Sequence, residues 1–378
     1  MKKILIVNNN MDMGGIQKSL ANFLNALHGS YDLTLLLFSK SGSLLDEIPE
    51  DVKVIVPRRC YRVMGLTRQE LRAYPDLFLL KGLLKQWCRI FSRRSAMRIL
   101  GLFQKKISGY DCVISFSHLT GEKNFMYGCG DFVLDKTISG CKICLFHCDY
   151  LHAFEWGSDR QEFAEFDRIA CCSESVRVRF LEGSHLPGTQ VVTLRNFYDF
   201  GVKQLAKTDP FPYDPRFVNL ISVARLSPEK GIDRAVQAIS DSRRTDLRYY
   251  IVGDGPQRSA LERKIKELHL QDRVYLLGEQ SNPYRYMLHA DYLLVPSLHE
   301  AAPMVYDEAN MIGLRILSTE TTSAREMISQ GRICENTVED MTGMLCAVTK
   351  SEDDCGCGGC IRDNRLQEQQ FAELLGRN

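Results

Sequence analysis

The 378-residue chain has little net charge and no long apolar run. Lys plus Arg number 48 and Asp plus Glu number 47, so the formal net charge is +1. A protein that coats nucleic acid along its length needs an excess of cations, so the balance excludes that class. The sequence has no stretch of about 18 uncharged apolar residues, so it predicts no membrane-spanning helix. The first apolar run ends at Asn8, too early for a signal peptide, and we expect none.

The 14 cysteines could suggest a disulfide framework, but that interpretation suits short secreted chains. We therefore predict thiols in a reducing cytoplasm. Four of them, Cys346, Cys355, Cys357 and Cys360, lie close enough in sequence to surround a zinc ion. Because only one pair has the Cys-x-x-Cys spacing, a glycine-rich surface loop is the favoured interpretation and zinc is the alternative.

The composition is that of a folded protein, with 44% hydrophobic and 25% charged residues. At roughly 150 residues per domain the length predicts two domains. We place them at 1–200 and 201–378, with a proline-rich hinge near 196–216. The amphipathic segment 366–375 could pack back onto the first domain.

Short apolar runs alternate with segments of helical period in both halves, which predicts βαβ units and parallel sheets. The expected fold class is therefore α/β, with two doubly wound, Rossmann-like domains facing a central cleft. The predicted strands are 4–7, 33–38, 52–56, 112–116, 143–146 and 169–171, then 217–223, 249–252, 274–277, 292–295 and 315–317. The main predicted helices are 15–27, 173–181, 230–239, 256–268 and 304–312.

Gly14 and Gly15 follow the first predicted strand and begin a helix. Bare backbone N–H groups at a helix N-terminus can bind an anion. A plain turn explains the pair equally well. Since no third glycine follows at the required spacing, this is not the dinucleotide fingerprint, and a nicotinamide dehydrogenase is set aside.

Two cations and two carboxylates follow strands of the second half. Arg225 and Lys230 lie in the strand-to-helix turn 222–231, where they suit a diphosphate, although a solvated basic turn is the alternative. Glu300 and Glu308 are eight residues apart, so both can face one cleft if the first lies in a loop and the second on the next helix. Solvated acidic residues near a helix N-terminus are the alternative.

Taken together, these motifs resemble retaining glycosyltransferases of the GT-B fold, specifically family 4. The resemblance runs from Lys2 to about Glu339 and includes Tyr250-Ile-Val-Gly-Asp-Gly-Pro256 and Arg273-Val-Tyr-Leu-Leu-Gly278. It implies transfer of a sugar from a UDP- or GDP-linked donor to a hydroxyl, with retained anomeric configuration. Asn310-Met-Ile-Gly-Leu-Arg315 also matches, whereas Ala301-Ala302-Pro303 departs from the glycine and aromatic of many relatives.

The resemblance also implies roles for individual residues. Arg225 and Lys230 would neutralise the diphosphate, Glu300 would contact the transferred sugar, and Glu308 would hold the ribose. His147 matches a family position that faces the sugar, although a lone histidine at a strand end is more often structural. The remaining donor-binding positions are Gly14, Gly15, Gly253, and the backbone N–H groups of Met304 and Val305.

Family members generally work without a metal, and this sequence has no Asp-x-Asp pair for a diphosphate-bound cation. We expect no cofactor, because the nucleotide sugar is a substrate. The predicted role is synthesis of a surface glycan such as capsule, O-antigen or exopolysaccharide, on a glycan or lipid-linked acceptor. The alternative is a GT-B protein that binds nucleotide sugar without turnover and acts as a partner or scaffold.

The segment from Arg58 to Lys106 holds 13 Lys/Arg and 2 Asp/Glu, a local charge of +11. Lys81, Lys85 and Arg89 are spaced to share one helical face, with Arg93 and Arg94 following. Basic amphipathic helices bind anionic membranes, so we expect a peripheral protein at the inner face of the plasma membrane. A helix that covers the sheet is the alternative, and both can hold. Nucleic acid is disfavoured because no binding motif accompanies the charge.

Overall fold

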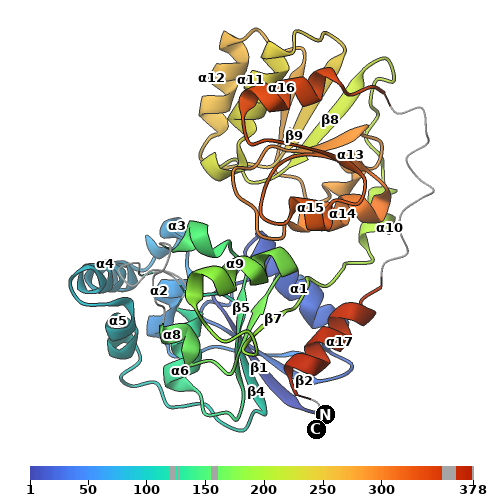
Figure 1. The fold of residues 1–378 in the computed structure, drawn as a ribbon. Helices are drawn as coiled ribbons and strands as arrows, with labels where there is room; N and C mark the ends of the chain where they lie inside the picture. Colours follow the sequence, from blue (N-terminus) through green and yellow to red (C-terminus); the bar gives the residue numbers. More distant parts are fainter. Residues whose placement is uncertain (120–124, 126–127, 155–160, 351–362, 377–378) are drawn as a thin grey trace. The chain divides into compact units, whose positions relative to one another are not determined.

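The computed structural model describes residues 1–119, 125, 128–154, 161–350 and 363–376. The chain divides into two compact units (Figure 1). The first comprises Met1–Phe197 and Asn364–Asn378, and the second Tyr198–Asp363. The division falls inside the predicted hinge. The terminal helix belongs to the first unit and not to the second.

The first unit is built on a seven-stranded sheet of described residues, in the order β3-β2-β1-β4-β5-β6-β7. Its strands are β1 (Lys3–Asn8), β2 (Asp32–Leu37), β3 (Lys53–Ile55), β4 (Cys112–Ser115), β5 (Lys142–Phe146), β6 (Arg168–Cys171) and β7 (Val191–Thr193). Its helices are α1 (Gly15–Leu27), α2 (Arg62–Gly65), α3 (Arg68–Leu71), α4 (Pro75–Ile90), α5 (Arg93–Leu100), α6 (Cys129–Lys136), α7 (Tyr150–Ala153), α8 (Gln161–Ala164), α9 (Glu174–Ser184) and α17 (Arg365–Leu374).

The second unit repeats the plan with six described strands in the order β10-β9-β8-β11-β12-β13. Its strands are β8 (Val218–Val223), β9 (Leu247–Val252), β10 (Val274–Gly278), β11 (Tyr292–Val295), β12 (Arg315–Thr319) and β13 (Gly331–Cys334). Its helices are α10 (Val202–Ala206), α11 (Ile232–Asp241), α12 (Arg258–Glu267), α13 (Tyr284–Met287), α14 (Met304–Ile312), α15 (Ala324–Met327) and α16 (Val338–Cys346).

Parallel pairing in both sheets follows from strands that are apolar on both faces. In β1, for example, all residues after Lys3 are buried. Each crossover carries a helix or loop back over the sheet, so neighbouring strands point the same way. The predicted α/β class with two Rossmann-like sheets is therefore confirmed.

The chain returns to the first unit through α17, which packs into that unit's core. The Phe371 ring meets Phe23 of α1 edge-on, with ring centroids 5.0 Å apart. Phe116 and Phe197 contact the same Phe23 ring edge-on, each at 5.5 Å. Lys2 also donates hydrogen bonds to carbonyls at the end of α17. The last helix thus completes the core around α1.

Two strands were missed by the sequence analysis, β7 and β13. They are only three and four residues long, and β13 is exposed or half-buried throughout. Such edge strands lack the continuous apolar run that identifies a central strand. Within the described part of the chain, no helix combines the length and apolarity needed to cross a membrane.

Candidate functional site

The strand order of the second sheet reverses between β8 and β11. From β8 the chain moves outward through β9 and β10, and it then returns to β11 on the other side of β8. The loops after β8 and β11 therefore diverge from neighbouring strand ends, which is where open α/β sheets bind ligands. The first loop carries Arg225 and Lys230, and the second carries Glu300.

Lys230 and Glu300 meet at this point, 70 residues apart in sequence. The Lys230 Nζ lies 2.7 Å from Glu300 Oε1, and the two side chains are 26% and 10% exposed. Ser297 Oγ donates a second hydrogen bond of 2.7 Å to the same oxygen. No hydrogen bond from a described residue reaches Glu300 Oε2. The carboxylate is thus fixed through one oxygen, and the other can accept a hydroxyl group.

The backbone holds the two loops together. Gly231 adopts φ +62°, and a Cβ there would lie 2.1 Å from the Pro296 carbonyl oxygen, so only glycine permits this approach. The Leu298 N–H donates to the Glu229 carbonyl at 2.8 Å. Thr319 Oγ1 donates to the Ser297 carbonyl at 2.6 Å. These contacts fix the geometry of the cation and the carboxylate before a ligand binds.

Arg225 is exposed and lies in the same loop as Lys230. The positive charge of this loop affects the pKa of the neighbouring Glu229 carboxyl. Burial raises the pKa of that carboxyl, but the hydrogen bond from Ser227 and the charges of Lys230 and Arg225 outweigh burial, so the pKa is lowered. An anion that binds at this loop meets the same two cations.

Helix α14 follows the Glu300 loop and begins at Met304, after Pro303 in extended conformation. The first backbone N–H groups of a helix have no intrahelical acceptor, so those of Met304 and Val305 face outward with the positive end of the dipole. One turn further on, Glu308 Oε1 accepts a 2.9 Å hydrogen bond from the Tyr284 hydroxyl of α13. The second carboxylate is therefore also held in place.

Gly253 lies in the loop after β9 and has φ +135°. A Cβ at this position would lie 1.9 Å from the Ala224 carbonyl oxygen. The glycine thus lets the loop after β9 pack against the loop that carries Arg225. The structure gives it this backbone role, and a donor-binding role for it stays a prediction.

In the first unit, Gly14 is the extended N-cap of α1, and no side chain caps the helix. A Cβ added at Gly15 would meet no atom within 4 Å. Space is therefore open at Gly15, whereas a Cβ at Gly14 would lie 2.8 Å from Gln17 Oε1. Gly14, Gly15 and His147 belong to the first unit, whereas the cations and both carboxylates belong to the second.

His147 follows β5, and its ring packs against Phe116 with centroids 5.3 Å apart. Its Nε2 is covered and has no hydrogen-bond partner among the described residues. Burial, together with the neighbouring His118, lowers the pKa of His147 to about 3. Burial also lowers the pKa of His118 to about 4. Both imidazoles are therefore neutral near pH 7.

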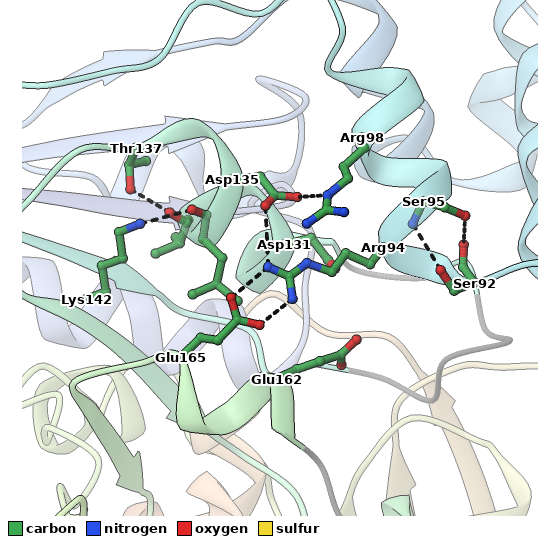
Figure 2. Close-up of polar contacts among 12 residues, drawn as sticks. Ser92, Arg94, Ser95, Arg98, Asp131, Asp135, Thr137, Lys142, Glu162 and Glu165 are labelled. Carbon is green, nitrogen blue, oxygen red and sulfur yellow. Dashed lines mark hydrogen bonds and ion pairs between the residues drawn. The ribbon is translucent and has the colours of Figure 1, made fainter.

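In the basic segment 58–106, some cations are buried in ion pairs and others are exposed. Arg93 was predicted to contact a membrane, but its side chain is 1% exposed and pairs with Asp131 and Glu162 at 2.9 and 2.7 Å. That prediction is wrong, because the charge is needed inside to neutralise two carboxylates. Arg94 also points inward and pairs with Glu165 (Figure 2).

The other three cations of the prediction lie on α4. Lys81 is half-buried, its Nζ lies 3.4 Å from the Leu66 carbonyl, and burial lowers its pKa. Lys85 and Arg89 are exposed. Only these two of the five predicted residues are fully available to an anionic surface.

The zinc site that the sequence left as an alternative falls largely outside the described residues. Cys346 is exposed and lies near the Ser242 carbonyl, while Cys355, Cys357 and Cys360 lie outside the described residues. Among the described residues, no three His, Cys, Asp or Glu side chains form a group that could hold a metal.

Residues 211–354 match the family described as Glycosyl transferases group 1. N-acetyl-alpha-D-glucosaminyl L-malate synthase of Bacillus anthracis is 29% identical over 42% of this chain and 43% of that relative. A Campylobacter jejuni enzyme, N-acetylgalactosamine-N,N'-diacetylbacillosaminyl-diphospho-undecaprenol 4-alpha-N-acetylgalactosaminyltransferase, is 31% identical over 36% of this chain and 35% of the relative. The aligned region thus spans less than half the length of each relative.

Among solved structures, Anabaena Alr3699/HepE in complex with UDP superposes with a TM-score of 0.66 at 16% identity, covering 99% of both chains. At that identity the likeness shows the fold, which is GT-B. The chain thus has the GT-B fold that the motifs indicated. The match of residues 211–354 to the glycosyl transferases group 1 family is consistent with the resemblance to family 4.

Sequence reasoning missed two hydroxyl groups of the site. Ser297 donates to Glu300, and Tyr284 donates to Glu308. Ser297 lies three residues before Glu300, a spacing that could have marked it as a partner. Tyr284 lies on α13, 24 residues before Glu308, and no local signal connects them.

Proposed function

We propose that this chain is a retaining glycosyltransferase that moves a sugar from a UDP- or GDP-linked donor to a hydroxyl of a glycan or lipid-linked acceptor. The observation that carries the proposal is the Lys230–Glu300 pair at the switch point of the second sheet, with a free carboxylate oxygen. The family match of residues 211–354 and the UDP bound by a structural neighbour support it.

The proposed chemistry follows from charge. When the bond between sugar and diphosphate breaks, negative charge grows on the leaving group and positive charge grows on the sugar. Arg225 and Lys230 stabilise the diphosphate, and the N–H groups of Met304 and Val305 bind a phosphate oxygen. Glu300 Oε2 orients the sugar and stabilises its developing positive charge. Glu308 holds the ribose hydroxyls.

Three residues of the first unit also have proposed roles in ligand binding. Gly14 and Gly15 bind an anionic group through backbone N–H groups at the start of α1, and neutral His147 contacts a sugar. We propose that no metal takes part, because the cations of the loop after β8 fill that role. Chelation with EDTA should then leave turnover unchanged.

The proposed setting is synthesis of a surface polysaccharide at the inner face of the plasma membrane. The Campylobacter relative, by its name, acts on a diphospho-undecaprenol-linked substrate, which supports a lipid-linked acceptor for this chain. The exposed cations Lys85 and Arg89 support contact with an anionic membrane surface.

Calorimetric titration with UDP, GDP and NAD, followed by donor hydrolysis assays, tests the proposal. One nucleoside diphosphate should bind and NAD should not, and Arg225→Ala should weaken binding by about tenfold or more. Glu300→Gln should lower turnover by about 100-fold while nucleotide binding persists, because removing one preorganised charge typically has such an effect. Lys230→Ala should lower both the turnover and the affinity for the nucleotide.

Two results would contradict the proposal. Nucleotide binding without any donor turnover would favour a scaffold protein. Near wild-type turnover in both Glu300→Gln and Lys230→Ala would remove the assigned site.

A further inference from the structure

The exposed apolar side chains of this protein are concentrated in one segment. Among the described residues, 17 large apolar side chains are exposed, and nine of them lie between positions 78 and 103. The others are single residues scattered over the chain, which is normal for a protein surface. A concentration of this kind marks a surface that binds a partner or a membrane.

Helix α4 carries the centre of this surface. Its inner face buries Leu77, Leu84 and Cys88. Its outer face exposes Leu79, Leu83 and Ile90, a set that we call the α4 strip, at 65, 61 and 71%. The spacings of four and seven residues align the three side chains on one side of the helix. The strip thus presents three largely exposed apolar side chains on one side of the helix.

An aromatic pair lies at the C-terminal end of the strip. The rings of Trp87 and Phe91 lie 4.4 Å apart, and both side chains are partly exposed. The Trp87 Nε1 donates to Ser95 Oγ at 3.0 Å, which fixes the indole. Tryptophan is enriched where protein meets the boundary between lipid headgroups and acyl chains.

Cations flank the strip on the same helix. Lys85 and Arg89 are exposed, lie one turn apart, and have no ion-pair partner among the described residues. Because an α-helix has 3.6 residues per turn, these two side chains point about 120° round the helix axis from the strip. The single acidic residue of α4, Asp76, pairs with Arg59. The surface thus combines an apolar line with uncompensated positive charge.

We infer that the α4 strip inserts into the headgroup boundary of an anionic lipid bilayer, with Lys85 and Arg89 on the lipid phosphates. Such helices lie in the plane of the bilayer with the apolar face about 5–10 Å deep. A second copy of the chain fits less well, because a twofold contact would bring the same unpaired cations together. Anchoring therefore comes from apolar burial, and the cations add attraction.

The attachment of α5 to its neighbours also holds α4 to the rest of the first unit. Arg93 ties α5 to α6 and α8 through the buried Asp131 and the half-buried Glu162, and α4 packs against α5. Arg94 adds a pair with Glu165 (Figure 2). The α4 strip is thus joined to the sheet of its unit and not to a loose loop. This inference deepens the membrane contact of the proposed function, but it concerns the first unit alone and is tested without a sugar donor.

Sedimentation with phosphatidylcholine vesicles, with and without phosphatidylglycerol, tests the inference on the full chain. Leu79→Ser/Leu83→Ser/Ile90→Ser should lower partitioning onto anionic vesicles by about tenfold or more. The control Ile138→Ser/Val178→Ser, which changes exposed apolar residues elsewhere in the first unit, should not. Lys85→Gln/Arg89→Gln should lower binding to anionic vesicles in low salt.

A second measurement separates insertion from adsorption. In Trp156→Phe, Trp87 is the remaining tryptophan, and lipids brominated along the acyl chain should quench its fluorescence. Unchanged partitioning of the α4 strip variant, or unquenched Trp87 on bound protein, would overturn the inference. So would a dimer, seen by light scattering, that the strip variant abolishes. Circular dichroism should show that the same variants are folded. Their binding of UDP should be unchanged, so a failure of membrane binding can be told apart from a failure of the proposed function.

Discussion

Glu300 shows how one side chain is prepared for a ligand by its partners. Its Oε1 accepts hydrogen bonds from Lys230 and Ser297, and no described residue binds Oε2. Both donors are needed to hold the carboxylate in one orientation, because a single hydrogen bond leaves rotation possible. Ser297 is the neutral one of the two donors, and Lys230 supplies the charge. This division of roles is a property of the site before any ligand arrives.

Gly253 offers a test of backbone geometry in the same region. Gly253→Ala should lower the free energy of unfolding by at least about 2 kcal/mol, because the methyl group would collide with the Ala224 carbonyl at φ +135°. The control is Gly343→Ala in α16, where a Cβ meets no atom within 4 Å. That change should stabilise by about 0.5–1 kcal/mol. Urea unfolding measures both.

The buried histidines predict a dependence of stability on pH. The pKa values of His147 and His118 in the folded chain, about 3 and 4, lie below the unfolded value. Their contribution is complete above about pH 6.5 and is lost as the pH falls toward 4, because the unfolded chain then binds protons that the folded chain does not. Between pH 7 and 4.5, wild type should lose about 2 kcal/mol more than His147→Gln. Equal losses in urea unfolding would show that His147 is not a buried neutral group.

At the scale of elements, the helices of the first unit differ in how they are held. Helix α1 is held by apolar packing, with Leu20, Phe23, Leu24 and Leu27 all buried. Helix α5 buries Ala96, Met97 and Leu100 and adds a buried ion pair, since its Arg93 lies between carboxylates of α6 and α8. A buried charge that loses its partner destabilises strongly, so α5 is sensitive to single substitutions.

Arg93→Met tests this attachment of α5. The variant should lower the free energy of unfolding by about 3–5 kcal/mol, because Asp131 is left buried and unpaired. The control Arg98→Met removes a 62% exposed cation 3.5 Å from Asp135 and should change stability by less than about 1 kcal/mol. Similar losses in the two variants would show that the buried pairs do not hold α5.

Most strands and several of the longer helices were predictable because they carry a local periodic signal, whereas most short helices were not predicted. Helices α1 and α14 begin and end at the residues that the sequence predicted. Strands of the sheet centres were found within one or two residues, since each is a continuous apolar run. The edge strands β7 and β13 were not found, because pairing with a neighbour along one side defines them and their own composition does not.

At the scale of the whole molecule, the chain crosses between its two units twice. It leaves the first unit after Phe197 and returns at Asn364, so α17 joins a core whose other residues lie between positions 4 and 197. The Phe23 ring is enclosed by three other rings, one of them from α17. The stability of the first unit therefore depends on the last residues of the sequence.

Phe371→Ala should destabilise the first unit by about 3–5 kcal/mol, because it leaves a cavity beside Phe23. Hydrogen exchange should accelerate in β1 and α1 and stay unchanged in β8 and β9, which have their own core. The control Leu366→Ala removes a 48% exposed side chain of the same helix and should have little effect. Acceleration in both units would mean that they unfold together.

The sequence by itself determined the fold class and the candidate residues of the site. Apolar runs separated by helical segments allow only parallel sheets, and Arg225, Lys230, Glu300 and Glu308 stand at strand ends that can be located from those runs. Tertiary structure decided which of these groups touch. Lys230 meets Glu300 because the strand order reverses between β8 and β11, a choice of pairing among distant strands. Tertiary structure also decided that Arg93 is buried and that the α4 strip is exposed, since burial depends on neighbours that are far away in sequence.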